Sequence, residues 1–166
     1  MAVKNYFNNT SLFILLLAGT LSSCKIIQPM SSTKVYAFRL KPGQDLKKSI
    51  QEFVDEKQIS AGWMSAGVGS LTHYNIRFAN QAEASSGQGH FEIVSLTGTV
   101  SKNGSHLHLA ISDSTGRTIG GHLADGNLVY TTVEIVITAS TQLQFTRETD
   151  ATTGWKELEV IEKNDQ

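Results

Sequence analysis

Hydrophobic and polar residues alternate along most of this chain, in segments that short polar stretches separate. Alternation places successive side chains on opposite faces of an extended backbone, which is the pattern of a β-strand with one buried face. The segments with this pattern are 34–40, 72–78, 90–101, 105–112, 117–124 and 130–140, with shorter pieces near 142–148 and 155–161. The chain is therefore predicted to be rich in strands joined mostly by short turns.

Three other segments depart from this alternation. Between Asp45 and Ile59, charged residues separate apolar ones at helical spacing, which predicts the one main helix. Residues 62–71 are rich in glycine, serine and alanine, so we expect their backbone to pack closely against a neighbour. Residues 80–89 are polar and predict a loop. One helix with many strands indicates an α+β fold, a single domain built on a largely antiparallel sheet.

Length and composition are those of one globular domain. The chain has 166 residues, of which 40% are hydrophobic and 17% are charged. Its formal net charge is −1, and its lysines and arginines are scattered. Affinity for a polyanion comes mainly from clustered basic residues, so no nucleic-acid partner is expected.

The N-terminal segment resembles a bacterial lipoprotein signal peptide. Lys4 precedes an apolar run at 11–19, which is too short to span a bilayer. The run ends in Leu-Ser-Ser-Cys at 21–24, which resembles a lipobox, a motif that is cut before the cysteine so that its thiol can carry lipid. The sequence thus predicts a leader at 1–23 and lipidation of Cys24. The alternatives are an ordinary secretory signal with an incidental cysteine and a buried first helix.

The predicted lipid on Cys24 places the protein in the cell envelope, attached to a bacterial membrane by the lipid anchor alone. Because Lys25 rather than aspartate follows the cysteine, the outer membrane is favoured over the inner one. Residues 24–33 are predicted to be a tether, 34–161 the folded domain and 162–166 a tail. With no second cysteine, the mature domain cannot form an intrachain disulfide, so its stability must come from its core and from assembly.

Three histidines are predicted to converge on one hairpin. Within 104–112 the apolar residues fall at odd positions, so His106 and His108 share the opposite face. A three-residue turn that ends in a left-handed Gly116 sets His108 opposite His122, with their β-carbons roughly 5 Å apart. Three imidazoles on one face can hold one transition-metal ion.

Zinc is the first choice for such a site, and another first-row ion such as iron or nickel fits the same ligands. Gly120 shares the predicted face and is expected to leave open space beside the ion. Three protein ligands with room for water are the arrangement of catalytic zinc, whereas a fourth ligand from a neighbouring subunit would make the ion structural. The alternative is that the histidines are polar residues on a solvated or subunit-facing surface, hydrogen-bonded without a metal.

Hydrolysis at this site would need a general acid or base. Glu92 and Glu134 are candidates, and the alternative for each is a salt bridge or an interface hydrogen bond. His73 and His90 fall outside the histidine pattern and are expected on the surface or in loops, and both tryptophans are expected to be packing residues. Because no known catalytic or nucleotide-binding motif is visible, whether the protein is an enzyme stays open.

Five motifs connect this sequence to a known family. They are AGVGSL at 66–71, GHFEIVSLTG at 89–98, HLHLAISD at 106–113, GGHL at 120–123 and TVEIV at 132–136. Together they resemble the plants-and-prokaryotes-conserved (PPC) domain family over about residues 34–161. The resemblance implies a PPC-like domain with an antiparallel sheet that assembles as a homotrimer, but it implies hardly any reaction.

The residues and the resemblance support three functional hypotheses. The first is an envelope-anchored trimer that binds a transition metal through His106, His108 and His122, with a hydrolytic or ligand-binding activity on an unknown substrate. The second is a non-enzymatic module whose trimer presents loops to another protein. The third is DNA binding, because plant members of the family carry an AT-hook, a short peptide that enters the minor groove. This sequence contains no such peptide, and its predicted export and its charge also argue against DNA.

Overall fold

The computed structural model describes residues 32–163 of the chain. The predicted leader at 1–23, Cys24 and most of the predicted tether lie outside these residues. Within them, no helix is long and apolar enough to cross a membrane.

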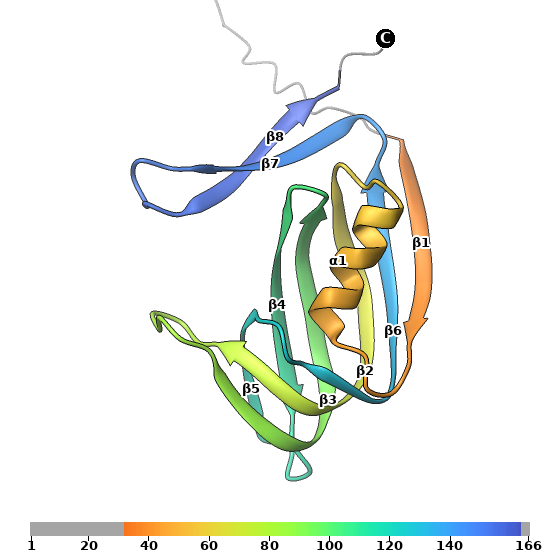
Figure 1. Cartoon of the computed structure of the whole chain (residues 1–166), viewed down its shortest axis with the longest axis vertical. Helices are drawn as coiled ribbons and strands as arrows, with labels where there is room; N and C mark the ends of the chain where they lie inside the picture. The colour runs from red at the N-terminus through yellow and green to blue at the C-terminus, as the bar shows by residue number, and fades with distance from the viewer. Residues whose placement is uncertain (1–31, 164–166) are drawn as a thin grey trace, which may run out of the picture.

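The described residues form an antiparallel sheet of six strands with a helix on one face (Figure 1). In chain order the elements are β1 Thr33–Leu40, α1 Leu46–Glu56, β2 Gly62–Arg77, β3 Ser85–Ser101, β4 Gly104–Ser112, β5 Thr118–Leu123, β6 Leu128–Ser140, β7 Leu143–Thr149 and β8 Lys156–Glu162. The order across the sheet is β1-β6-β2-β3-β4-β5, and the end of β2 also pairs with β5. The strands β7 and β8 form a separate hairpin that projects beyond the sheet, here named the arm. This architecture confirms the predicted α+β fold.

The helix α1 begins at a capping carboxylate and ends at a left-handed residue. The Oδ1 atom of Asp45 accepts a hydrogen bond from the amide of Lys48 at 3.1 Å, which caps the first turn. The side chains that the helix buries are Leu46, Ile50 and Val54. The helix stops at Glu56, before the predicted end at Ile59, because Gln58 adopts a φ of +51°, which is incompatible with a helix interior.

The hydrophobic core lies between α1 and the sheet face that the helix covers. On β4, the odd-numbered residues Leu107, Leu109 and Ile111 are buried, as the alternation predicted. Successive side chains of a strand point to opposite faces, so His106 and His108 lie on the face away from this core. Burial of three apolar side chains in one strand therefore fixes the direction of the two imidazoles.

The small residues of 62–71 allow β2 to approach its neighbours closely, as expected. A β-carbon added to Gly67 would lie 2.8 Å from the side chain of Leu96 in β3, closer than packed atoms approach. Residues 62–71 and 72–78 were predicted as separate segments, but β2 runs through both of them to Arg77. Its pairing with β3 shifts register between Leu71 and His73.

The predicted loop at 80–89 is wrong in its second half, because β3 already begins at Ser85. There it pairs with the end of β2, with Ser85 opposite Ile76 and Gly87 opposite Tyr74. A β-carbon on Gly87 would lie 2.6 Å from the Tyr74 ring, so the ring covers this glycine. A strand is held by backbone hydrogen bonds and needs no apolar residue of its own, which is why polar composition was misleading here.

The buried side chain of Asn127 joins the end of β2 to the segment after β5. Its Oδ1 accepts a hydrogen bond from the amide of Asn75 at 3.0 Å, and its Nδ2 donates to the carbonyls of Asn75 and Ala124 at 3.0 and 2.7 Å. Asn127 is 0% exposed, so no water can replace these bonds without a rearrangement. Asn127 thereby holds β5 against β2.

We expect Asn127→Ala to lower the free energy of unfolding by about 2–3 kcal/mol, because the amide of Asn75 and the carbonyl of Ala124 lose their partner and the carbonyl of Asn75 keeps only the amide of Ala124. Chemical denaturation followed by circular dichroism measures this change. The matched control is Gln88→Ala, which removes an exposed amide side chain and should change the stability by less than about 0.5 kcal/mol. Equal stabilities of the two variants would contradict the structural role given to Asn127.

Candidate metal centre

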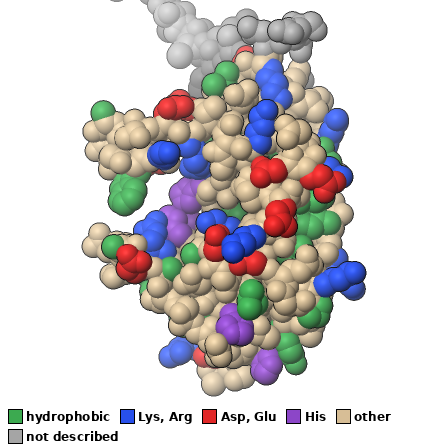
Figure 2. Space-filling view, viewed as in Figure 1, with side chains coloured by type: hydrophobic (Ala, Val, Ile, Leu, Met, Phe, Trp, Pro, Cys, Tyr) green, Lys and Arg blue, Asp and Glu red, His purple; other side chains and the backbone are tan. Residues whose placement is uncertain are grey.

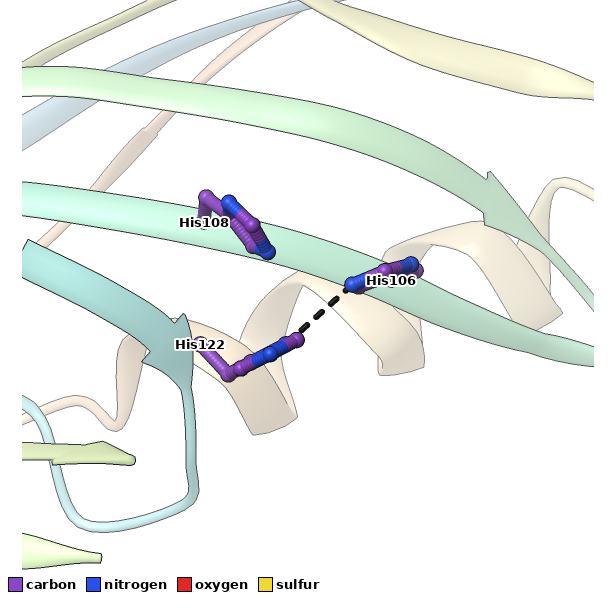
Figure 3. Close-up of side chains that lie close together, drawn as sticks. All are labelled: His106, His108 and His122. Atoms are coloured by element: carbon purple, nitrogen blue, oxygen red, sulfur yellow. Dashed lines mark hydrogen bonds between the residues drawn. The ribbon is translucent and has the colours of Figure 1, made fainter. Parts of the chain in front are cut away.

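The three histidines lie together on the β4–β5 hairpin, as predicted (Figure 3). His106 and His108 belong to β4, and His122 belongs to β5. The observed register pairs His108 with His122, which confirms the predicted alignment. Figure 3 shows the three side chains gathered on one side of the hairpin, with His106 and His122 joined by a hydrogen bond.

The turn between the strands sets this register. Gly116 has a φ of +81°, and its amide donates to the carbonyl of Asp113 at 2.9 Å. The Asp113 carboxylate accepts hydrogen bonds from the amides of Thr115 and Arg117 at 2.9 and 3.1 Å. The hydroxyl of Thr115, and then its amide, lower the pKa of Asp113, so this carboxylate remains charged as an acceptor for the turn.

The nitrogen atoms of the three rings are close enough for one ion. One ligand atom from each of the three histidines lies within 4.8 Å of the other two. The Nε2 atom of His106 and the Nδ1 atom of His122 are 3.1 Å apart. Nitrogens bound to one tetrahedral zinc ion lie roughly 3.3 Å apart, from Zn–N bonds of about 2.0–2.1 Å. The donor set of three imidazoles therefore fits a transition metal, which would take the place of the proton that His106 and His122 share.

The surroundings favour the neutral form of two of the imidazoles. Burial lowers the pKa of His106, with a further lowering from the charge of Arg147. Burial also lowers the pKa of His122, where Arg77 adds to the effect. A neutral imidazole has the free lone pair that metal binding requires, so both shifts favour coordination near neutral pH.

A cleft of about 880 Å³ opens beside His106 and His122. Its walls are the end of β2, the turn that follows it, the start of β4 and the arm. Figure 2 shows histidines at a recess between the arm and the body of the domain, with lysine and arginine side chains beside it. The candidate metal position is therefore reached from an open side of the molecule.

The sequence predicted that Gly120 would leave open space beside the histidines, but the space does not come from this residue. A β-carbon on Gly120 would lie 2.9 Å from the carbonyl oxygen of Leu109, because the β4 backbone runs directly against it. The open volume lies instead toward the arm, where Trp155 borders it. Trp155 is 69% exposed, so the prediction that it packs is wrong, whereas Trp63 is half-buried in β2.

The other two histidines of the described region lie in strands, outside the cluster. His73 is half-buried in β2, where its Nδ1 hydrogen-bonds the Thr72 hydroxyl at 2.9 Å. His90 is exposed in β3, and its ring centroid lies 4.4 Å from that of Tyr130. Neither belongs to the group of side chains that could share an ion.

Neither predicted carboxylate reaches the metal position. Glu92 pairs with Ser112, four residues along β4 from His108, or roughly 13 Å at 3.3 Å per residue. Glu134 lies on β6, which β2 and β3 separate from β4. The carboxylate that does border the cleft is Glu157 of β8, whose charge raises the pKa of His106 against the stronger lowering effects.

The sequence prediction missed the cationic side of the cleft. Arg77 is brought there by the pairing of β2 with β5, in which it lies opposite His122. Arg147 and Lys156 are brought there by the arm. None of these residues is near the histidines in sequence, and the only local signal was the strand pattern of the segments that carry them.

Comparisons with known proteins agree with the fold. The chain is 43% identical over 132 residues to a bifunctional protein GlmU of Synechococcus sp., an alignment that covers 80% of this chain and 21% of that protein. The chain therefore spans about a fifth of the length of the curated relatives that it matches.

Two solved structures are similar along nearly their whole length. A hypothetical protein from Salmonella cholerae-suis has a TM-score of 0.80 and 40% identity, over 82% of this chain and 99% of that one. A metal-containing protein from Archaeoglobus fulgidus has a TM-score of 0.65 and 27% identity, over 78% and 98%. Residues 27–141 match the family described as the Plants and Prokaryotes Conserved (PCC) domain, the PPC domain of the motifs above. This chain belongs to the PCC domain family.

Proposed function

We propose that this protein binds one transition-metal ion per subunit through His106, His108 and His122, with zinc as the first choice. The observation that carries the proposal is the convergence of three imidazoles, whose ligand atoms lie within 4.8 Å of one another, on one hairpin. The turn at Asp113 and the burial of the apolar side chains of β4 fix the register of this hairpin. The lowered pKa values of His106 and His122 support it, because they favour the neutral imidazole that coordinates a metal. The similarity to a metal-containing protein of Archaeoglobus supports it independently.

A metal held by three protein ligands has coordination positions left for a ligand that enters from the cleft. When bound, such an ion supplies Lewis acidity to that ligand. The chain's own residues would orient the ligand, and Glu157 is the carboxylate placed to hold or accept a proton beside His106. A ligand-binding metal centre is therefore our proposal, with hydrolysis as the reaction that Glu157 would have to assist.

Each of the variants His106→Ala, His108→Ala and His122→Ala should lose most of its bound metal, because two imidazoles hold zinc far more weakly than three. Elemental analysis of protein purified without an affinity tag, and of protein refolded with zinc, should find close to one ion per chain in the unmodified protein. His73→Ala and His90→Ala are the controls and should keep full occupancy. Well under one ion per chain in both preparations of the unmodified protein would overturn the metal site.

We further propose that the protein assembles as a homotrimer through the part of the uncovered sheet face that β1, β6, β2 and β3 form, whereas the histidines lie on β4 and β5. Four apolar side chains on this face are exposed, namely Val35, Val68, Val94 and Tyr130. They come from four different strands of the sheet, so a second subunit that covered this face would remove all four from water. The family resemblance supplies the trimeric state.

Val68→Asp should convert the trimer into monomers at micromolar concentration, because a carboxylate of each subunit would be desolvated in the interface. Sedimentation equilibrium on residues 25–166 measures the mass. Val160→Asp places the same charge on the arm, at a valine of similar exposure, and should leave the mass unchanged. A monomeric unmodified protein would rule out the assembly.

We also propose that the protein is anchored in the cell envelope by a lipid on Cys24, on the strength of the leader sequence. Expressed with its own leader, the protein should fractionate with membranes. Cys24→Ala should release it or block its processing, which mass spectrometry of the mature N-terminus detects. Unchanged membrane attachment and mature mass in this variant would exclude the anchor.

A further inference from the structure

The cleft beside the histidines has an excess of positive charge. Three cationic side chains border it, those of Arg77, Arg147 and Lys156, against the single carboxylate of Glu157. The chain as a whole has a formal net charge of −1, so this concentration is a local feature. A concave surface with such a charge attracts anions.

The two arginines have no carboxylate partner within the described part of the chain, where the ion pairs found join other residues. Arg77 donates through Nη1 to the carbonyl of Gln81 at 3.1 Å. Arg147 donates to the hydroxyl of Thr99 at 2.9 Å and to the carbonyl of Lys156 at 3.5 Å. These contacts to neutral groups orient both guanidinium groups while leaving donors of each unused, since a guanidinium has five N–H groups.

Partial burial makes Arg147 a favourable partner for an anion. Both arginines are half-buried, and burial lowers the pKa of Arg147, with Glu157 acting in the opposite direction. A partly desolvated cation that forms no direct ion pair is held at a cost in free energy, and a bound carboxylate or phosphate recovers that cost through charge-assisted hydrogen bonds.

The cleft is also too large and too apolar for a simple inorganic anion. Its volume of about 880 Å³ is in the upper part of the range of small-molecule sites, roughly 300–1,000 Å³. Trp155, 69% exposed at the turn of the arm, borders it and offers a flat apolar face. An indole in this position suits an apolar or aromatic body that carries the anionic group.

We propose that this cleft binds a small organic anion whose carboxylate or phosphate pairs with Arg77 and Arg147 and whose apolar body packs on Trp155. Lys156 contributes to the same charge. The bound anion would lie beside His106 and His122, so the inference names the class of ligand that the proposed metal centre would take. Only the contact between anion and metal rests on the proposed function. Pairing with the arginines does not require the ion.

The experiment is isothermal titration calorimetry of the full mature chain, both zinc-loaded and zinc-free, with four probes. Phenyl phosphate and benzoate have an aromatic body, whereas inorganic phosphate and acetate do not. One of the aromatic probes should bind saturably with a Kd below about 1 mM, and its partner without the ring should bind more weakly. The preferred aromatic probe identifies the anionic group as phosphate or carboxylate.

Substitutions assign the binding to the cleft. Arg77→Gln and Arg147→Gln should each weaken the preferred probe about tenfold or more, because each removes a charge-assisted hydrogen bond. Lys156→Gln should weaken it less, and because this side chain is exposed, the variant remains informative if Arg147→Gln fails to fold. Arg117→Gln is the matched control, since Arg117 is an exposed arginine of the β4–β5 turn outside the cleft, and it should leave binding unchanged. Trp155→Ala should weaken only the aromatic probes.

Two readouts separate this inference from the proposed metal site. Zinc content is measured on every variant, and the arginine variants should keep it. Probe binding that depends on Arg77 without any zinc content would retain the anion site and reject the metal site. Saturable binding of no probe, or binding that Arg77→Gln and Lys156→Gln leave unchanged, would overturn the anion site. A DNA duplex that binds more tightly than phenyl phosphate and depends on Arg77 would overturn the assignment to a small molecule.

Discussion

The register of the β4–β5 hairpin is the constraint on which the whole site depends. A slip of one residue in either strand would turn its histidines into the core, because side chains alternate with a period of two. Two independent sets of interactions prevent this slip. The Asp113 carboxylate and the left-handed Gly116 hold the turn, and burial of Leu107, Leu109 and Ile111 holds the faces of β4. The turn and the core therefore determine which face the imidazoles occupy, and the hydrogen bond between His106 and His122 forms on that face.

The opposite wall of the cleft depends on contacts between residues far apart in sequence. Asn127 holds the end of β2 against the segment after β5 and so brings Arg77 beside His122. The base of the arm is fixed in the same manner, since Phe145 is buried and its carbonyl accepts a hydrogen bond from Asn103 Nδ2 at 2.8 Å. The turn at the other end of the arm is exposed to solvent and carries Trp155. The arm, which forms one wall of the cleft, is therefore fixed at its base and solvated at its turn.

The contrast between these two walls explains how far the sequence could predict the structure. The strands, the helix and the convergence of the histidines follow from local rules, because alternation and a short turn involve only neighbouring residues. The strand at 85–89 was not predicted, because its polar side chains cover no core and its pairing with β2 is made by the backbone. The position of Arg77 and Arg147 at the cleft was not predicted, because the pairing of β2 with β5 and the placement of the arm leave no local pattern in the sequence. The cluster of three histidines was predictable, whereas its surroundings were not.

The electrostatics of the cleft link its two proposed ligands. Arg147 and Arg77 lower the pKa values of His106 and His122, which means that their charges oppose any added positive charge at the imidazoles. The same charges oppose a divalent metal in that position, although they also keep the rings neutral enough to bind it. An anion that paired with the arginines would offset this repulsion and so would strengthen metal binding. Because coupling between two binding sites is reciprocal, the metal strengthens anion binding by the same factor. A cationic cleft beside the proposed metal position is therefore suited to binding a metal ion and an organic anion together.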